Sequence, residues 1–229
     1  MVRPVRYPNG INNANVRTPF YNIGLPDPSV YATYFDDFVK FTAADWTITK
    51  VGTGTTALST ATLPGGNLVV TNSAAGSDSV FLQAIGPSFK YTAGKGLAFK
   101  ARFKVDDATL AGFVIGLQET DTTPLDVNNG IAFYKPAATA VMSASVEASN
   151  TASSIATVAT IASDTYIEVG FSYEPRLSTV NFFANGALVG ALPLTNMPTV
   201  VMTPSFGVVN GSGVVRIMTV DYILAMLER

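Results

Sequence analysis

The sequence contains no cysteine and no histidine, and charged residues make up only 13% of its 229 residues. Without cysteine the chain has no disulfide framework and no thiolate nucleophile. Without histidine it has no imidazole base, and the usual ligands of zinc sites are missing. These two absences exclude the Ser-His-Asp, Cys-His and zinc-hydrolase mechanisms. We expect no catalytic residue, no cofactor site and no metal site.

Charge and hydropathy exclude further classes of protein. The net charge of −2 provides no basic footprint for nucleic acid, so no nucleic-acid partner is expected. No run of 18 apolar residues is long enough to span a bilayer, so no membrane partner is expected. The first ten residues, MVRPVRYPNG, contain arginines but lack the apolar segment of a secretory signal peptide.

The low charge density has two interpretations. A share of 13% charged residues, against about 25% in ordinary globular proteins, leaves a largely neutral surface. The protein is either an ordinary β protein with a weakly charged surface, or one whose surface is partly buried against other subunits. We favour the second, because charged residues are depleted from the cores of subunit interfaces.

The stretch from 166 to 192 carries the clearest structural signal. Between 166 and 174 polar and apolar residues alternate with the period of two that a strand with two unlike faces requires. Pro175 interrupts the strand, since proline has no N–H to donate to a sheet. Asn185-Gly186 follows the next β-rich run, and both residues tolerate the positive φ angles of a two-residue hairpin turn. This stretch therefore predicts consecutive antiparallel strands.

Short strands separated by turns recur along the rest of the chain. Leu97 to Val105 (LAFKARFKV) shows the cleanest alternation, with apolar residues on one face and Lys100, Arg102 and Lys104 on the other. About a dozen strands at this spacing predict an all-β, antiparallel two-sheet jelly-roll sandwich over residues 31–229. Beside the stretch described above, we expect strands at 31–39, 46–51, 68–71, 79–85, 97–105, 112–118, 130–134, 140–147, 155–161, 200–209 and 214–227.

Residues 1–30 differ from this domain and form what we name the N-terminal arm. Five prolines recur among asparagines without apolar periodicity, so neither a helix nor a central strand is expected. The arm is either a disordered leader or an extended segment that becomes ordered on a neighbouring subunit. Its aromatic residues favour the second. The expected partner-binding residues are Arg3, Arg6, Tyr7, Ile11, Arg17, Phe20, Tyr21 and Ile23.

Several stretches resemble the concanavalin-like, laminin-G-type jelly-roll family. They are YFDDF followed by Trp46, GLAFKARFKVDD, GFVIGLQ followed by GIAFY, and the late YIEVGFSYEP and STVNFFANGALVGAL pair. The resemblance covers roughly residues 34–229. It implies the jelly-roll fold, in a family of lectins, glycan-binding modules, some glycosidases and lyases, and jelly-roll proteins of tailed-phage virions.

Taken whole, with its Pro/Asn-rich arm and Ala/Thr/Ser-rich body, the chain is most similar to a phage head decoration or cement protein. The resemblance implies a non-enzymatic structural protein of the virion that binds the outer capsid surface and stabilises the shell. Its partners would be the major capsid protein and sister copies in a homotrimer, and it would be made in the host cytoplasm without a signal peptide. The alternative is a glycan-binding module of a tail fibre or similar receptor-binding structure.

The candidate sites in the domain have competing explanations. The family's hydrolytic Glu-x-Asp-x-x-Glu type of run is missing, which argues against catalysis. The loop at 119–130 is rich in oxygen ligands that calcium accepts, yet such residues are commonly just solvated turns, and we assign no ligand. Trp46 is expected in the core rather than as a sugar platform. A basic stripe is either a solvated sheet face or a contact with an acidic partner; its members are Lys95, Lys100, Arg102 and Lys104.

Overall fold

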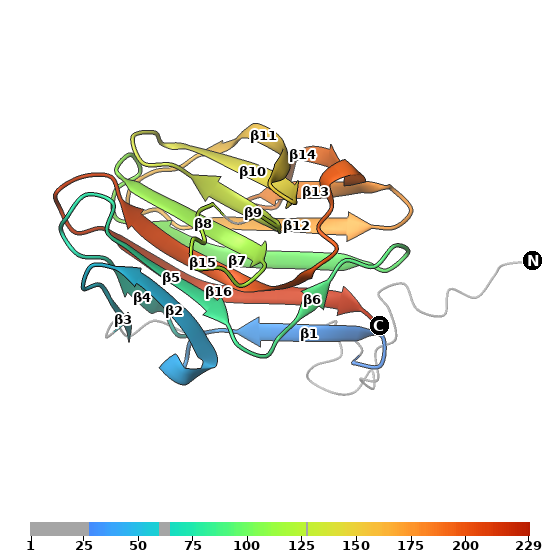
Figure 1. Ribbon diagram of the computed structural model, residues 1–229, viewed down its shortest axis with the longest axis horizontal. Coiled ribbons are helices and arrows are strands. Elements are labelled where there is room, and N and C mark those ends of the chain that lie inside the picture. Colours follow the sequence, from blue (N-terminus) through green and yellow to red (C-terminus); the bar gives the residue numbers. More distant parts are fainter. Residues whose placement is uncertain (1–27, 60–64, 127) are drawn as a thin grey trace, which may run out of the picture.

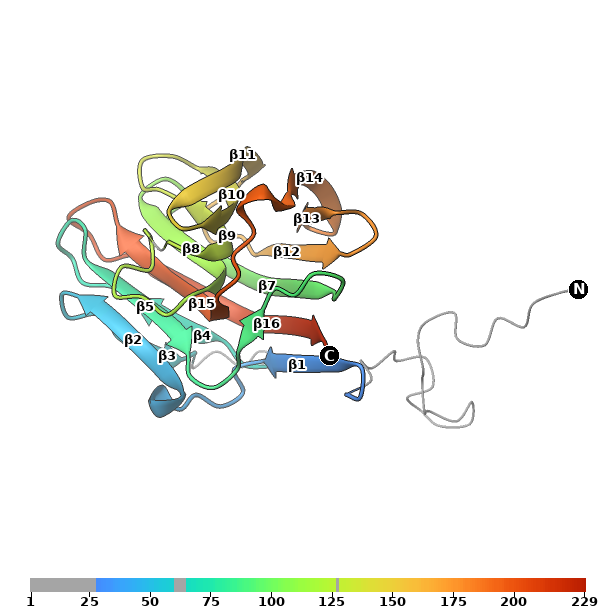
Figure 2. The same cartoon turned by 45° about the vertical axis from the view of Figure 1, so that its right-hand side comes forward.

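The computed structural model describes residues 28–59, 65–126 and 128–229, and these residues fold into two packed antiparallel sheets of eight strands each. Figures 1 and 2 show the sheets as the two layers of a sandwich. Two single-turn 3-10 helices, Ala43–Asp45 and Leu194–Asn196, accompany the strands. No helix of the described chain is long and apolar enough to cross a membrane. The predicted all-β jelly-roll sandwich is confirmed.

The first sheet, sheet one, is built around the last strand of the domain. Its order is β14-β13-β12-β7-β16-β4-β3, and β1 pairs with the second half of β16, where β4 has ended. Figure 1 places β1 at this edge, next to the C-terminus. The strands are β1 (Tyr31–Asp36), β3 (Thr55–Leu58), β4 (Leu68–Thr71), β7 (Leu97–Val105), β12 (Ile167–Glu174), β13 (Thr179–Ala184), β14 (Ala187–Pro193) and β16 (Ile217–Glu228).

The second sheet, sheet two, has the order β11-β10-β9-β8-β15-β5-β2, with the short β6 paired to the start of β15. It consists of β2 (Trp46–Val51), β5 (Ser79–Ala84), β6 (Phe89–Lys90), β8 (Ala111–Gln118), β9 (Gly130–Lys135), β10 (Val141–Ala148), β11 (Thr151–Thr160) and β15 (Val201–Asn210).

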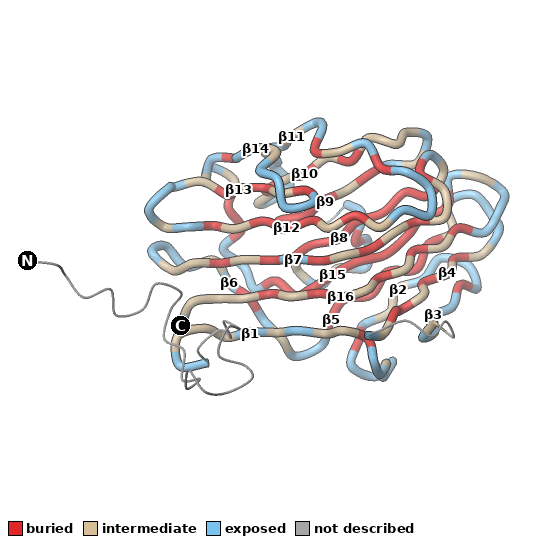
Figure 3. Tube along the Cα trace, turned by 180° about the vertical axis from the view of Figure 1, so that it is seen from behind, coloured by how far each residue is buried: buried red, intermediate tan, exposed pale blue. Residues whose placement is uncertain are grey.

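Aromatic side chains join the two sheets across the core. Phe103 of β7 meets Phe113 of β8 edge-on, with 4.9 Å between ring centroids, and Phe182 of β13 meets Phe133 of β9 at 5.5 Å. The burial tube of Figure 3 shows the resulting alternation of buried and less buried residues along β7 and β12. Trp46 is 5% exposed. The expectation that it belongs to the core is therefore confirmed.

The structure corrects several predicted boundaries. The first strand ends at Asp36 rather than at 39, because the Asp36 carboxylate accepts the backbone N–H of Phe38 and Phe38 takes a positive φ of 47°. No strand was expected between the strands at 46–51 and 68–71, yet the edge strand β3 lies there and pairs with β4. The turn between β10 and β11 is only Ser149-Asn150, both at positive φ, and not a loop over 148–154.

A buried lysine fastens the end of β9, and the sequence pattern does not predict it. Lys135 has 0% exposure, and its ammonium group donates to the carbonyl oxygens of Thr139 at 2.8 Å, Pro136 at 3.2 Å and Thr109 at 3.4 Å. Burial lowers the pKa of Lys135 to about 8, opposed in part by the negative charge of Asp107. The cation ties three loop carbonyls together, and one of them, that of Thr109, also accepts the backbone N–H of Ala138 at 2.8 Å.

The turn between β13 and β14 is the predicted two-residue hairpin turn. Asn185 and Gly186 have φ angles of 49° and 77°. The Asn185 side chain also accepts the N–H of Glu168 at 3.0 Å, which fastens the turn to β12. A Cβ added at Gly186 would meet no heavy atom within 4 Å, so the position is restricted by its φ angle and not by space.

We therefore expect Gly186→Val to lower the free energy of unfolding by about 1 kcal/mol or more, because a β-branched residue resists a positive φ. The matched control is Gly186→Asn, which adds a side chain but tolerates this conformation. Urea denaturation of the three proteins measures the difference. Equal stability of the valine and asparagine variants would contradict the explanation.

Candidate functional site

The outer face of sheet two carries buried residues that do not belong to the core between the sheets. Phe113 and Ile115 of β8 point into that core, whereas Val114 between them belongs to a separate apolar cluster with Phe81 and Ala132. Neighbouring residues of a strand point to opposite faces. The second cluster therefore lies on the face of sheet two that is turned away from sheet one.

The loop between β8 and β9 folds back onto this outer face. The Gln83 side chain of β5 donates to the carbonyl of Glu119 and accepts the N–H of Asp121, both at 2.9 Å. Gln118, at the end of β8, donates to the carbonyl of Pro124 at 2.9 Å. Two buried glutamines thus hold the loop against the sheet. The loop in turn covers these polar side chains, which is why they are buried although they lie on the outer face.

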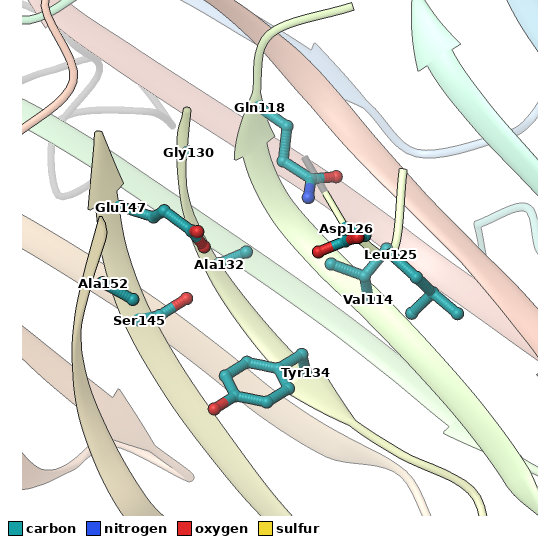
Figure 4. A pocket seen from close by; sticks show the side chains of 10 residues that line it. All are labelled: Val114, Gln118, Leu125, Asp126, Gly130, Ala132, Tyr134, Ser145, Glu147 and Ala152. Carbon is teal, nitrogen blue, oxygen red and sulfur yellow. The ribbon is translucent and has the colours of Figure 1, made fainter. Parts of the chain in front are cut away.

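A pocket of about 100 Å³ lies between this loop and strands β9 to β11. In Figure 4 the Glu147 carboxylate reaches from β10 toward the middle of the pocket, and Asp126 reaches in from the loop on the other side of β9. Small residues form the floor, and Tyr134 closes one end. The lining consists of Val114, Gln118, Leu125, Asp126, Gly130, Ala132, Tyr134, Ser145, Glu147 and Ala152.

The register of the strands places these side chains together. Glu147 pairs with Gly130, and Ser145 pairs with Ala132, so β10 and β9 present them on the same face. Gly130 has no side chain, and a Cβ at this position would meet the side chain of Gln118 and the carbonyl of Leu117, both at 3.1 Å. The 20 residues between Asp126 and Glu147 in the sequence include β9, the β9–β10 connection and the first six residues of β10.

The pocket is acidic and holds an unpaired acceptor. Burial raises the pKa of Glu147, and the nearby negative charge of Asp126 raises it further. Gln118 is 2% exposed, and its Oε1 atom has no hydrogen-bond partner among the described residues. A buried acceptor without a donor costs free energy, and this cost accompanies the hydrogen bond by which Gln118 holds the loop.

Sequence reasoning did not identify this pocket. The 119–130 loop was noted for its oxygen atoms, but Glu147 lies in an Ala/Ser/Val-rich strand that gave no functional signal. The usable signal was the position of Glu147, because a glutamate alternating with buried Val146 and Ala144 must lie on the outer face of its strand. Which residues lie across the pocket from Glu147 depends on the pairing of β9 with β10, and the sequence does not show this pairing.

The loop oxygens considered for calcium are mostly engaged within the loop. The Asp121 carboxylate accepts the N–H and hydroxyl of Thr123 at 2.7 and 2.8 Å. The Glu119 carboxylate accepts the Asn129 side chain at 3.0 Å. Within the described residues, no three Asp, Glu, His or Cys side chains come together as a metal site would need.

The basic stripe lies on the outer face of sheet one, and most of its cations face carboxylates of the same chain. The pairs are Lys100 with Glu168 at 2.9 Å, Arg102 with Asp221, and Lys104 with Asp164 at 3.4 Å. Lys95 lies in the turn between β6 and β7. Contact of this stripe with an acidic partner stays a prediction. Carboxylates of the same chain already compensate part of the positive charge that such a partner would meet. The eight arm residues Arg3 to Ile23 lie outside the described residues.

The comparisons with known proteins support the fold. No protein-family model matches this sequence, and no curated protein matches it. Peanut lectin is similar in structure, with a TM-score of 0.59 and 11% identity over 86% of this chain and 97% of the lectin. A glycosidic hydrolase has a TM-score of 0.57 and 14% identity, and endo-β-1,4-glucuronan lyase from Trichoderma reesei has a TM-score of 0.57 and 11% identity. Each enzyme match covers 84% of this chain and 94% of the enzyme. The described domain has a lectin-like, concanavalin-like jelly-roll fold.

The comparison also corrects the expectation that the chain is not an enzyme. A glycosidic hydrolase and a glucuronan lyase share its fold. The missing Glu-x-Asp-x-x-Glu run excluded one local arrangement of carboxylates. It says nothing of carboxylates from separate segments, such as Asp126 of the β8–β9 loop and Glu147 of β10, which line one pocket.

The electrostatics of the pocket can be tested directly. Asp126→Asn removes one of the two causes of the raised pKa of Glu147, so this pKa should fall while remaining above 4.5, since burial is the larger cause. Carbon-detected NMR titration of the side-chain carboxyl groups measures it. Asp121→Asn, in the same loop, is the control and should leave it unchanged. A Glu147 pKa that does not respond to Asp126→Asn would show that the two carboxylates do not interact.

Proposed function

We propose that the chain binds carbohydrate in the pocket between the β8–β9 loop and strands β9 to β11. The observation that carries the proposal is the convergence of the Asp126 and Glu147 carboxylates beside Gln118 over a floor of small residues. Sugar hydroxyls are donors that carboxylate and carboxamide oxygens accept. The half-buried ring of Tyr134 provides an apolar surface for the C–H face of a sugar.

Two lines of support come from the fold and the charge of the site. A lectin, a glycosidic hydrolase and a glucuronan lyase, all named for their action on carbohydrates, share this fold. The pocket is lined by two carboxylates and by no lysine or arginine. It would repel an anionic sugar, so the expected ligand is a neutral glycan and not a polyuronate.

A glycan array that contains neutral and uronic acid oligosaccharides tests the proposal, followed by calorimetric titration of the best ligand. Glu147→Gln should weaken binding about 10- to 100-fold, because it removes a charged hydrogen-bond acceptor. The matched control is Glu174→Gln on sheet one, which should bind as the unaltered protein does. Mass spectrometry of the same mixtures would detect cleavage of the glycan. Binding of no neutral glycan, or full binding by Glu147→Gln, would reject the proposal.

Attachment to the outer surface of a capsid is the second candidate function. In this case the chain would be a decoration protein of a virion, with the major capsid protein and sister copies in a trimer as its partners. The observation that favours it is the exposed apolar surface on sheet one, where Phe35 is 58% and Leu188 61% exposed. The two side chains stand at opposite edges of one sheet face, so a partner that covers the whole face would bury both.

Co-sedimentation with purified capsids and light scattering test this second candidate. Leu188→Lys should reduce co-sedimentation, because a charge would have to be buried at the contact. Thr47→Lys, on sheet two, is the control. A monomer that does not sediment with capsids would rule out this role.

A further inference from the structure

A row of aligned residues crosses the outer face of sheet one from edge to edge. The pairing register joins Phe35 of β1 to Leu224 of β16, and Phe183 of β13 to Leu188 of β14. Between these apolar pairs the row passes through Lys100 of β7 and Gly170 of β12, which also pair with their neighbours. Directly paired residues lie on the same face of a sheet. Bulky apolar groups thus stand at both ends of a row whose middle holds Lys100 and a glycine without a side chain.

Two hollows lie on this face of the sheet, the first at the middle of the row and the second farther along the strands, beyond the residues of the row. The first, of about 300 Å³, lies around Gly170 and reaches Phe183 and Leu224. The second, of about 350 Å³, extends toward Tyr31 at the start of β1 and Glu228 at the end of β16. Both are lined by Ala98, Ser172 and Met226, so they are continuous. We name them together the sheet-one groove.

The chain enters the described domain at the mouth of this groove. Tyr31 lines the second hollow and pairs with Glu228, and the N–H of Arg229 donates to the carbonyl of Val30 at 2.7 Å. Residues 1–27 therefore join the domain within a few residues of the groove. Ile23 lies eight residues before Tyr31, a span of up to about 26 Å when extended. Five strand spacings of about 4.8 Å make the row about 24 Å wide.

The composition of residues 1–27 complements the groove. This segment carries aromatic and aliphatic side chains close to its point of entry, at Phe20, Tyr21 and Ile23. Three arginines are its only charges before residue 27. The groove offers an apolar floor, and its mouth is lined by the carboxylates of Glu174 and Glu228. A segment rich in proline also loses less backbone entropy when it becomes ordered.

We propose that residues 1–27 dock in the sheet-one groove of their own molecule, with Phe20, Tyr21 and Ile23 covering the apolar row. The short tether favours the chain's own segment over a free one, because it raises the effective concentration of the segment at the groove. The docked segment covers Phe183 and Leu224, the apolar side chains of the row that line the groove.

Cross-linking of the full-length chain tests the proposal. Because the sequence contains no cysteine, the two introduced cysteines are the only thiols that can react. The groove pair is Ile23→Cys with Ser172→Cys, and the control pair is Ile23→Cys with Thr49→Cys on sheet two. A short bismaleimide should link the groove pair within one molecule at least about tenfold faster than the control pair, reflecting the difference in local concentration. Equal rates would overturn the proposal. Links between two molecules would overturn it too and assign the groove to a second copy.

Proteolysis gives a second, independent measurement. Docking shields the bond after Arg17, so trypsin should cut there at least about tenfold faster when Ser172→Trp fills the groove, since cleavage follows the population of the open form. Thr47→Trp on sheet two is the control and should leave the rate unchanged. Circular dichroism checks that each variant is folded. Equal cleavage of Arg17 in the Ser172→Trp and unaltered proteins would reject docking.

Discussion

Burial of one face of each sheet against the other is the constraint on which the rest of this structure depends. Edge-on contacts such as Phe103 with Phe113, and Phe133 with Phe182, fix the distance and register between the layers. Since side chains alternate along a strand, each residue committed to this core sends its neighbours outward. The residues available for binding, among them Glu147 and Gly170, are therefore selected by the same packing that stabilises the domain.

The outer faces of the two sheets differ in polarity and charge. Sheet two is covered by a polar loop that two buried glutamines hold in place, and its pocket is acidic with small residues beneath. Sheet one combines an apolar row with ion pairs such as Lys100 with Glu168. Ligands that reach one face leave the other free, so binding of a glycan and coverage by a chain segment are compatible in one molecule.

The sequence predicted those features that depend on neighbouring residues. The alternation of 97–105 and the Asn185-Gly186 turn are local, and both appear as expected. The strand β3 was missed because a short Thr-rich edge strand has little apolar pattern. The burial of Lys135 and the pairing of Glu147 with Gly130 could not be predicted. Both depend on contacts between segments far apart in the sequence, and no local pattern reveals how those segments are aligned. The candidate site was hidden for the same reason.

The position of β16 has a consequence for biosynthesis. This strand lies between β7 on one side and β4 and β1 on the other, so sheet one has no continuous centre without it. Its residues, 217–228, are translated after every other strand of the domain. Until residues 217–228 have been synthesised, β7, β4 and β1 lack their shared neighbour, and unpaired strand edges are prone to aggregation. Sheet one can therefore be completed only after the rest of the domain has been made.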